Sequence, residues 1–156
     1  MDNEKTDQLY ERFSHFYRER SAPLASSKMA WGFQCEDGWY KILYDMSKKI
    51  TKLSSVGLLA PAAVEVARWP DGTLRVEVRN LTPPVADIIT SAREQSRLTC
   101  EYCSYSPAFV REDGRATKGH VVCGRCIKKL EGPGKAKKQK RRKKPLRPPD
   151  TIIVKR

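Results

Sequence analysis

Four cysteines in two C-x2-C pairs constrain this chain more than any other feature. Cys100 and Cys103 form the first pair, Cys123 and Cys126 form the second, and 19 residues separate the two pairs. This spacing is typical of a site in which two tight turns, or knuckles, point four thiolates at one Zn²⁺ ion. Residues 108–110 and 120–122 flank a turn sequence at 112–115, which predicts a hairpin between the knuckles. We therefore predict a zinc ribbon with one Zn²⁺ per chain.

Other interpretations of these cysteines fit the sequence less well. Two disulfides would require an oxidising compartment, but residues 1–7 are acidic and polar and do not resemble a secretory signal. A redox-active C-x2-C pair is expected beside a βαβ unit, and the sequence predicts none. Four thiolates would complete a tetrahedral shell and leave no position for water, so we expect a structural ion. The polar first residues and the lack of a long apolar run lead us to expect a cytoplasmic protein.

Positive charge is concentrated at the C-terminal end of the chain. The sequence has 31 Lys and Arg against 18 Asp and Glu, a net charge of +13, of which residues 127–156 contribute +11. Prolines and glycines flank the densest run, which repels itself, and we predict a disordered basic tail over residues 132–156. The eight basic residues of this run are Lys135, Lys137, Lys138, Lys140, Arg141, Arg142, Lys143 and Lys144.

We expect the basic tail to bind DNA or RNA, because each Lys or Arg that contacts a phosphate releases condensed counterions. Such contacts carry no sequence specificity. The run also satisfies the pattern of a nuclear localisation signal, and a solvated tail that only aids solubility is a further interpretation. A membrane partner is not expected, because the chain has neither a lipidation motif nor a spanning apolar run.

Hydrophobic periodicity predicts an α+β fold for the rest of the chain. We expect helices over residues 7–20, 38–53 and 83–97, with Asp37 as the N-cap of the second helix. Residues 64–69 and 73–79 alternate strictly between apolar and polar positions around a Pro-Asp-Gly turn, which predicts a hairpin. Its basic positions Arg75 and Arg79 fit either a solvated sheet face or a binding surface, and we favour the solvated face. The expected division is a helix-helix-hairpin-helix domain (1–98), the zinc ribbon (99–131) and the tail (132–156).

Three motifs together resemble a known protein family. They are the aromatic block at 31–39, which ends in Glu-Asp-Gly-Trp, the Gly-Thr-Leu-Arg sequence at 72–75, and the segment at 92–103, which contains Ser-Arg-Leu-Thr-Cys-Glu-Tyr-Cys. This combination is similar to small proteins of bacteriophages and bacterial genomes in which GDGW and GTLR motifs precede a zinc ribbon. The resemblance implies a phage or prophage origin and the metal-binding role of the four cysteines. It implies no biochemical activity, and the basic tail is a departure from it.

The sequence offers little for catalysis. A zinc deaminase would require His-x-Glu before a Pro-Cys-x-x-Cys motif, and neither His15 nor His120 provides that pattern. Cys35 could pair with a histidine as a nucleophile, but a lone cysteine is more typical of a small buried residue. His120 could replace a cysteine as ligand, bind a ligating sulfur, or simply lie in a strand near the metal. We therefore expect no enzyme.

Two hypotheses for function follow from these features. The first is a non-enzymatic nucleic-acid-binding accessory protein, with the zinc ribbon as scaffold and the tail as binding arm. The alternative is a protein-interaction module that binds a host complex, such as a defence system or a polymerase. Its expected contacts are Trp31, Phe33, Trp39 and the apolar segment 151–154.

Overall fold

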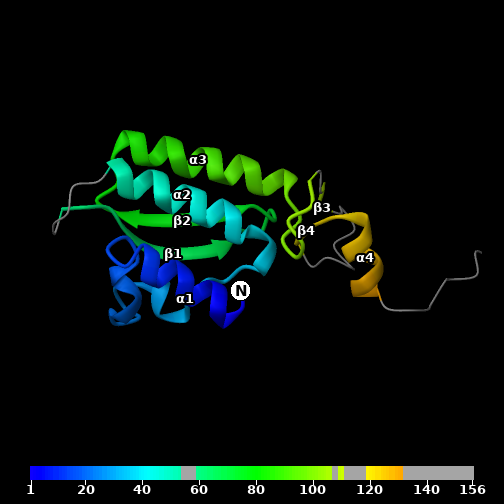
Figure 1. Ribbon diagram of the computed structural model, residues 1–156, viewed down its shortest axis with the longest axis horizontal. Coiled ribbons are helices and arrows are strands. Elements are labelled where there is room, and N and C mark those ends of the chain that lie inside the picture. Colours follow the sequence, from blue (N-terminus) through cyan, green and yellow to red (C-terminus); the bar gives the residue numbers. More distant parts are fainter. Residues whose placement is uncertain (54–58, 107–108, 111–118, 132–156) are drawn as a thin grey trace, which may run out of the picture.

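The computed structural model describes residues 1–53, 59–106, 109–110 and 119–131 of the chain. Helices surround a two-stranded antiparallel sheet, and a second small hairpin with a final helix extends from one end (Figure 1). The predicted α+β class is therefore confirmed. The predicted turn at 112–115 and the predicted basic tail at 132–156 lie outside the described residues.

The main sheet consists of β1 (Ala62–Arg68) and β2 (Leu74–Arg79), which pair antiparallel as the turn sequence predicts. A bulge between Ala63 and Glu65 interrupts the register, and β1 has buried residues on both faces. The prediction of strict alternation along β1 is therefore wrong. The 3-10 helices η1 (Arg18–Ser21) and η2 (Lys28–Trp31) pack against this strand.

Both arginines of β2 have acidic partners, in β2 itself or in neighbouring elements. The guanidinium of Arg75 lies 3.2 Å from the Glu65 carboxylate, pairs with Glu77 and covers the ring of Trp69. Arg79 lies 3.5 Å from Glu19. These arginines have acidic partners at close range, which fits the favoured interpretation of this face as a solvated sheet surface.

Two of the expected helices form nearly as predicted. Helix α2 (Tyr40–Leu53) buries an apolar stripe, although Leu53 at its end is 59% exposed. Helix α3 (Pro83–Leu98) begins with two prolines, whose fixed φ suits the first turn of a helix. The two helices pack together, and the buried hydroxyl of Ser96 on α3 accepts the backbone N–H of Leu74 at 2.8 Å.

The first helix is shorter than predicted and lies earlier in the chain. Helix α1 spans Asn3–Arg12, and the Asp2 side chain caps it by accepting the N–H of Lys5. The chain leaves the helical conformation at Phe13. Tyr17, which fits the helical period, instead lies fully buried beyond a turn, with its hydroxyl 2.6 Å from that of Ser47. Tertiary packing of the aromatic side chains thus overrides the periodic pattern in residues 13–20.

Asp37 does not cap α2, which corrects a second prediction. It lies in the 3-10 helix η3 (Asp37–Trp39), and its carboxylate accepts the backbone N–H of Asp2 at 2.7 Å and the Lys5 ammonium at 3.0 Å. Lys5 holds the pKa of Asp2 at about 2 through hydrogen bonds. Asp37 therefore ties the start of α1 to the start of α2.

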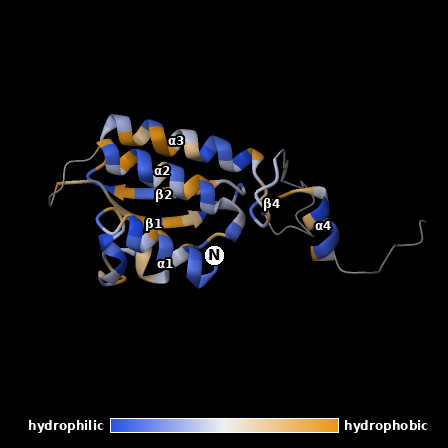
Figure 2. Cartoon of the chain, in the orientation of Figure 1, coloured by the Kyte–Doolittle hydropathy of each residue, from blue (hydrophilic) through white to orange (hydrophobic). Residues whose placement is uncertain are grey.

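The core lies between the helices and the sheet, where β1 is largely hydrophobic and β2 alternates between apolar and charged residues (Figure 2). Its largest fully buried side chains include Trp39, Tyr17, Leu9, Met29 and Leu43. Within the described residues, no helix combines the length and apolar character needed to cross a membrane.

Candidate metal centre

The cysteine-rich segment folds into a hairpin followed by a helix. Strands β3 (Phe109–Val110) and β4 (Val121–Val122) pair antiparallel, with Phe109 opposite Val122, as the sequence predicts. Helix α4 (Gly124–Glu131) follows at once. The hairpin places the end of β4 close to the first cysteine pair, because the N–H of Glu101 donates to the carbonyl of Val121 at 2.8 Å.

The second cysteine pair differs from the predicted knuckle. Cys123 immediately precedes α4 and Cys126 lies in its first turn, where the N–H of Ile127 donates to the Cys123 carbonyl at 3.0 Å. A helix therefore presents this pair, in place of a tight turn. An i, i+3 spacing puts both thiols on the same side of a helical turn, so a helix satisfies the C-x2-C spacing as well as a knuckle does.

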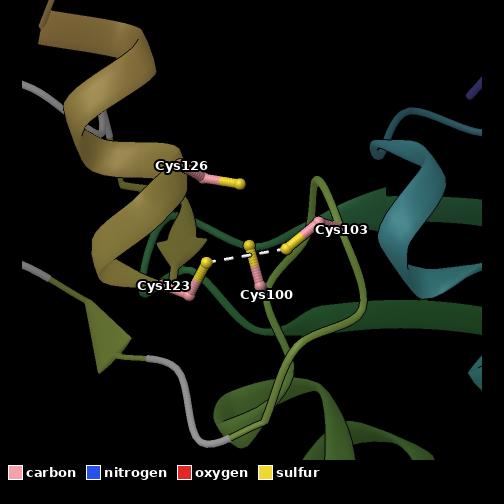
Figure 3. Close-up of side chains that lie close together, drawn as sticks. All are labelled: Cys100, Cys103, Cys123 and Cys126. Carbon is pink, nitrogen blue, oxygen red and sulfur yellow. Dashed lines mark hydrogen bonds between the residues drawn. The ribbon is translucent and has the colours of Figure 1, made fainter.

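The four sulfur atoms gather at one point. Those of Cys100, Cys103, Cys123 and Cys126 all lie within 4.8 Å of one another, and Cys103 Sγ lies 3.5 Å from Cys123 Sγ (Figure 3). A tetrahedral ion with metal–sulfur bonds of about 2.3 Å would place its ligand atoms about 3.8 Å apart. The distances therefore fit a tetrahedral metal ion, and these four cysteines form a possible site for a structural metal. Cys35 is buried elsewhere and is not a member of the cluster.

The start of α4 prepares the site for a metal. The backbone N–H of Cys126 donates to the Cys123 sulfur and lowers the pKa of that thiol to about 6. Removal from water raises the pKa of the buried Cys126 thiol. Metal ligands must be deprotonated, so the lowered pKa of Cys123 favours the thiolate form that a metal would bind.

The Glu-Asp-Gly-Trp block of residues 36–39 docks on the first cysteine knuckle. The N–H of Gly38 donates to the Glu101 carbonyl at 2.6 Å, and the Trp39 indole N–H donates to the Thr99 carbonyl at 2.9 Å. A Cβ atom on residue 38 would lie 2.2 Å from the Cys100 carbonyl oxygen, a distance that no packing tolerates. Only glycine permits this approach of two backbones.

Glu101 links the metal centre to the helical body. Its side chain is 0% exposed, yet each carboxylate oxygen has a partner. Oε1 accepts the N–H of Glu36 at 3.1 Å, and Oε2 lies 2.6 Å from His120 Nδ1 and 3.5 Å from the Arg68 guanidinium. A buried carboxylate is tolerated only with such compensation. Three segments therefore converge on the residue that lies between the two cysteines of the first pair.

His120 is engaged in this network and does not belong to the sulfur cluster. Its ring contacts both Glu101 and Arg68, the latter from the end of β1. The interpretation of His120 as a replacement ligand gains no support from this geometry. Sequence reasoning missed Glu101, Arg68 and Gly38 as parts of the site. One signal existed, because a charged residue inside a C-x2-C pair requires a partner once the knuckle is buried.

The remaining residues predicted to bind a protein or a nucleic acid do not form one site in the described part of the chain. Of the three aromatic residues expected to contact a protein partner, Trp31 is 60% exposed, whereas Phe33 and Trp39 belong to the core. All eight basic residues assigned to nucleic-acid binding lie outside the described residues. Comparison of the chain with protein-family models, curated proteins and solved structures gave no match.

Proposed function

We propose that the chain is a non-enzymatic nucleic-acid-binding accessory protein of phage or prophage origin, stabilised by one structural Zn²⁺. This proposal rests mainly on the distribution of charge along the sequence. Residues 127–156 account for +11 of the net charge of +13. Clustered Lys and Arg next to a nearly neutral body are the electrostatic footprint of proteins that bind phosphate backbones.

Zinc is the metal that suits the donors best. Four cysteine sulfurs at tetrahedral distances are typical of structural zinc sites, and thiolates select zinc over magnesium or calcium. Bound Zn²⁺ would fix the position of the first knuckle, the hairpin and α4. It would supply no catalytic chemistry, because four protein ligands leave no position for water or substrate.

Two residues that were considered for catalysis, Cys35 and His120, also support a non-enzymatic role. Burial raises the pKa of the Cys35 thiol to about 12, so this thiol stays protonated near neutral pH. The ring of His120 is held between Glu101 and Arg68. Neither residue is placed as an activated nucleophile requires.

Salt dependence tests the proposal. Affinity for a labelled duplex and a labelled single strand should fall steeply as salt rises, with roughly 5–8 phosphate contacts that each contribute about 0.9 to the log–log slope on duplex DNA. A full-length variant with Gln at the eight basic residues of 135–144 should lose most of this slope. Wild-type protein that binds neither probe at low salt would refute nucleic-acid binding.

The protein-interaction module remains as a second proposal because of one observation. Trp31 is 60% exposed, and large aromatic side chains anchor many protein interfaces. Binding through such an apolar anchor would persist in high salt, whereas phosphate contacts would not. A pull-down from bacterial lysate at low and high salt, with and without nuclease, separates the two functions.

A further inference from the structure

Helix α4 presents a basic face immediately before the basic segment of the sequence. Arg125, Lys128 and Lys129 are exposed, and their i, i+3 and i+4 spacing places them on one side of the helix. Cys126 and Ile127 are buried, which directs the other side toward the metal centre. The helix is accordingly hydrophilic over much of its surface (Figure 2). Within the part of the chain whose side chains are described, none of the three basic residues has an acidic partner.

An aromatic ring lies beside this face. Tyr105 follows the first knuckle and is 47% exposed, and the guanidinium of Arg125 lies 5.3 Å from its ring centroid. An exposed aromatic ring next to basic side chains is the arrangement that single-strand binding proteins use, since any base stacks on a ring while the phosphates contact Lys and Arg.

The metal centre holds both parts of this surface in place. The Tyr105 carbonyl accepts the N–H of Cys100 at 2.8 Å, and the first turn of α4 closes on the carbonyl of Cys123. Each of the two elements is therefore anchored at a cysteine of the cluster. Side chains on a fixed backbone lose less entropy on binding than side chains on a free arm.

We infer that Arg125, Lys128, Lys129 and Tyr105 form the rigid part of a single-stranded nucleic-acid interface, with the three basic side chains on phosphates and the tyrosine ring stacked on a base. This inference rests on the proposed function. It adds that the contact begins on the folded body, that single strands are the preferred form, and that the metal positions the contact.

A second basic cluster on the body competes for this role. Lys48, Lys49 and Lys52 border a groove of about 320 Å³ between α2 and α3, with Ile42 and Met46 among its lining residues. The groove has no aromatic side chain among its lining residues. Its three lysines lie in the second half of α2, whose C-terminal end points away from α4 (Figure 1). We favour α4 because its basic face lies beside the Tyr105 ring and because α4 precedes the basic residues 135–144 in the chain.

The matched lysines of α2 provide the control for the experiment. The full-length variants R125Q/K128Q/K129Q and K48Q/K49Q/K52Q remove the same charge from two exposed helical faces. Binding would be measured by fluorescence anisotropy with labelled oligo(dT) of about 20 nucleotides and with a duplex of the same length, over a range of salt. Three lost phosphate contacts should lower the log–log salt slope on oligo(dT) by about 2, at roughly 0.7 each for single strands. The α2 variant should bind like wild type.

Tyrosine variants test the stacking contact separately. Tyr105→Phe keeps the ring and should retain affinity for oligo(dT), whereas Tyr105→Leu should lose about 5-fold or more, as expected for one stacked base. Thermal unfolding and metal content must match wild type in every variant, so that a loss of binding reports the surface and not the fold.

Each remaining outcome has a definite meaning. Wild-type binding that the α4 variant leaves unchanged, or that the α2 variant alone reduces, overturns this inference but not the proposed function. Equal affinity of Tyr105→Leu and Tyr105→Phe, or preference for the duplex, overturns the assignment to single strands. Wild-type protein that binds neither probe at low salt overturns the proposed function and this inference together.

Discussion

The helical body and the cysteine-rich segment differ in what they bury. The body encloses large side chains such as Trp39, Tyr17 and Leu43, each fully or almost fully removed from water. Among the described side chains of segment 99–131, the apolar ones buried besides the cysteines are Val121, Val122 and Ile127, and the buried Glu101 is charged. Burial of a large apolar side chain contributes about 1.5–3 kcal/mol, so the body has many such contributions and the described part of the segment has few.

This difference gives a physical reason why a metal would be needed in the cysteine-rich segment and not in the body. A unit of fewer than about 40 residues seldom folds without a disulfide, a metal or a partner surface. The segment has two of these supports, namely four thiols at metal-binding distances and a docking surface on the body through Gly38 and Glu101. Of the predictions below, the first two each remove one of these supports and the last two change the body, in order of decreasing effect.

Loss of a cysteine should have the largest effect. We expect Cys123→Ser to abolish metal binding and to unfold β4 and α4, because metal binding in small sites is coupled to folding and contributes on the order of 10 kcal/mol. Metal analysis should fall from about one ion per chain to none. Hydrogen exchange should accelerate in 119–131 much more than in α2 and α3. A variant that keeps its metal and its wild-type thermal stability would show that Cys123 is not a ligand.

Disruption of the docking contact should come second. Gly38→Ala places a methyl group against the Cys100 carbonyl, and we expect a loss of about 2–3 kcal/mol in the free energy of unfolding. Gly124→Ala is the matched control, since a Cβ atom there meets nothing within 4 Å. Denaturant unfolding of both variants measures the difference. Equal stability would mean that the knuckle moves away from residue 38 at little cost.

A change inside the body should have a smaller effect and leave the metal in place. Ser96→Ala removes the acceptor of the buried Leu74 N–H, and an unsatisfied buried donor costs about 1–3 kcal/mol. Ser91→Ala, at an exposed position of the same helix, should change stability little. Chemical denaturation and metal analysis of both variants provide the readout. Loss of metal in Ser96→Ala would show that the cysteine cluster depends on this hydrogen bond inside the body, against our expectation.

The smallest effect is expected from the fifth cysteine. Cys35→Ala should retain one metal ion per chain and lose about 1–2 kcal/mol of stability through the small cavity left in the core. Metal analysis and thermal unfolding would both be measured. Metal loss in this variant would place Cys35 among the ligands and exclude one member of the cluster.

Features that depend on residues close together in the sequence could be predicted, whereas features that depend on distant residues could not. The cysteine spacing and the periodic stripes of α2 and α3 lie within short windows, so they predicted the thiol cluster and both helices. The end of α1 could not be predicted in this way, because Phe13 and Tyr17 fit a helix equally well. In the structure the chain leaves the helix at Phe13, and the Tyr17 hydroxyl meets that of Ser47, 30 positions away.

The candidate metal ligands could be predicted from the sequence, but the helix and the side chains that hold them in place could not. Spacing identified Cys123 and Cys126, yet two residues between cysteines suit a turn and a helix alike, so α4 was missed. The partners of Glu101 come from residues 36, 68 and 120. No local pattern connects positions so far apart, and only the tertiary structure shows that a buried carboxylate joins them.

The docking of residues 36–39 on the first knuckle also has a consequence for the timing of synthesis. The hydrogen bond between Trp39 and Thr99 spans 60 positions, and the one between Glu36 and Glu101 spans 65. At roughly 5–20 residues per second, a ribosome needs about 3–13 s to make that intervening stretch. Throughout this interval the start of α2 is complete but lacks the backbone carbonyls that accept from Gly38 and Trp39. The nascent chain can therefore form these hydrogen bonds, and complete the packing around Trp39, only after the first cysteine pair has been made.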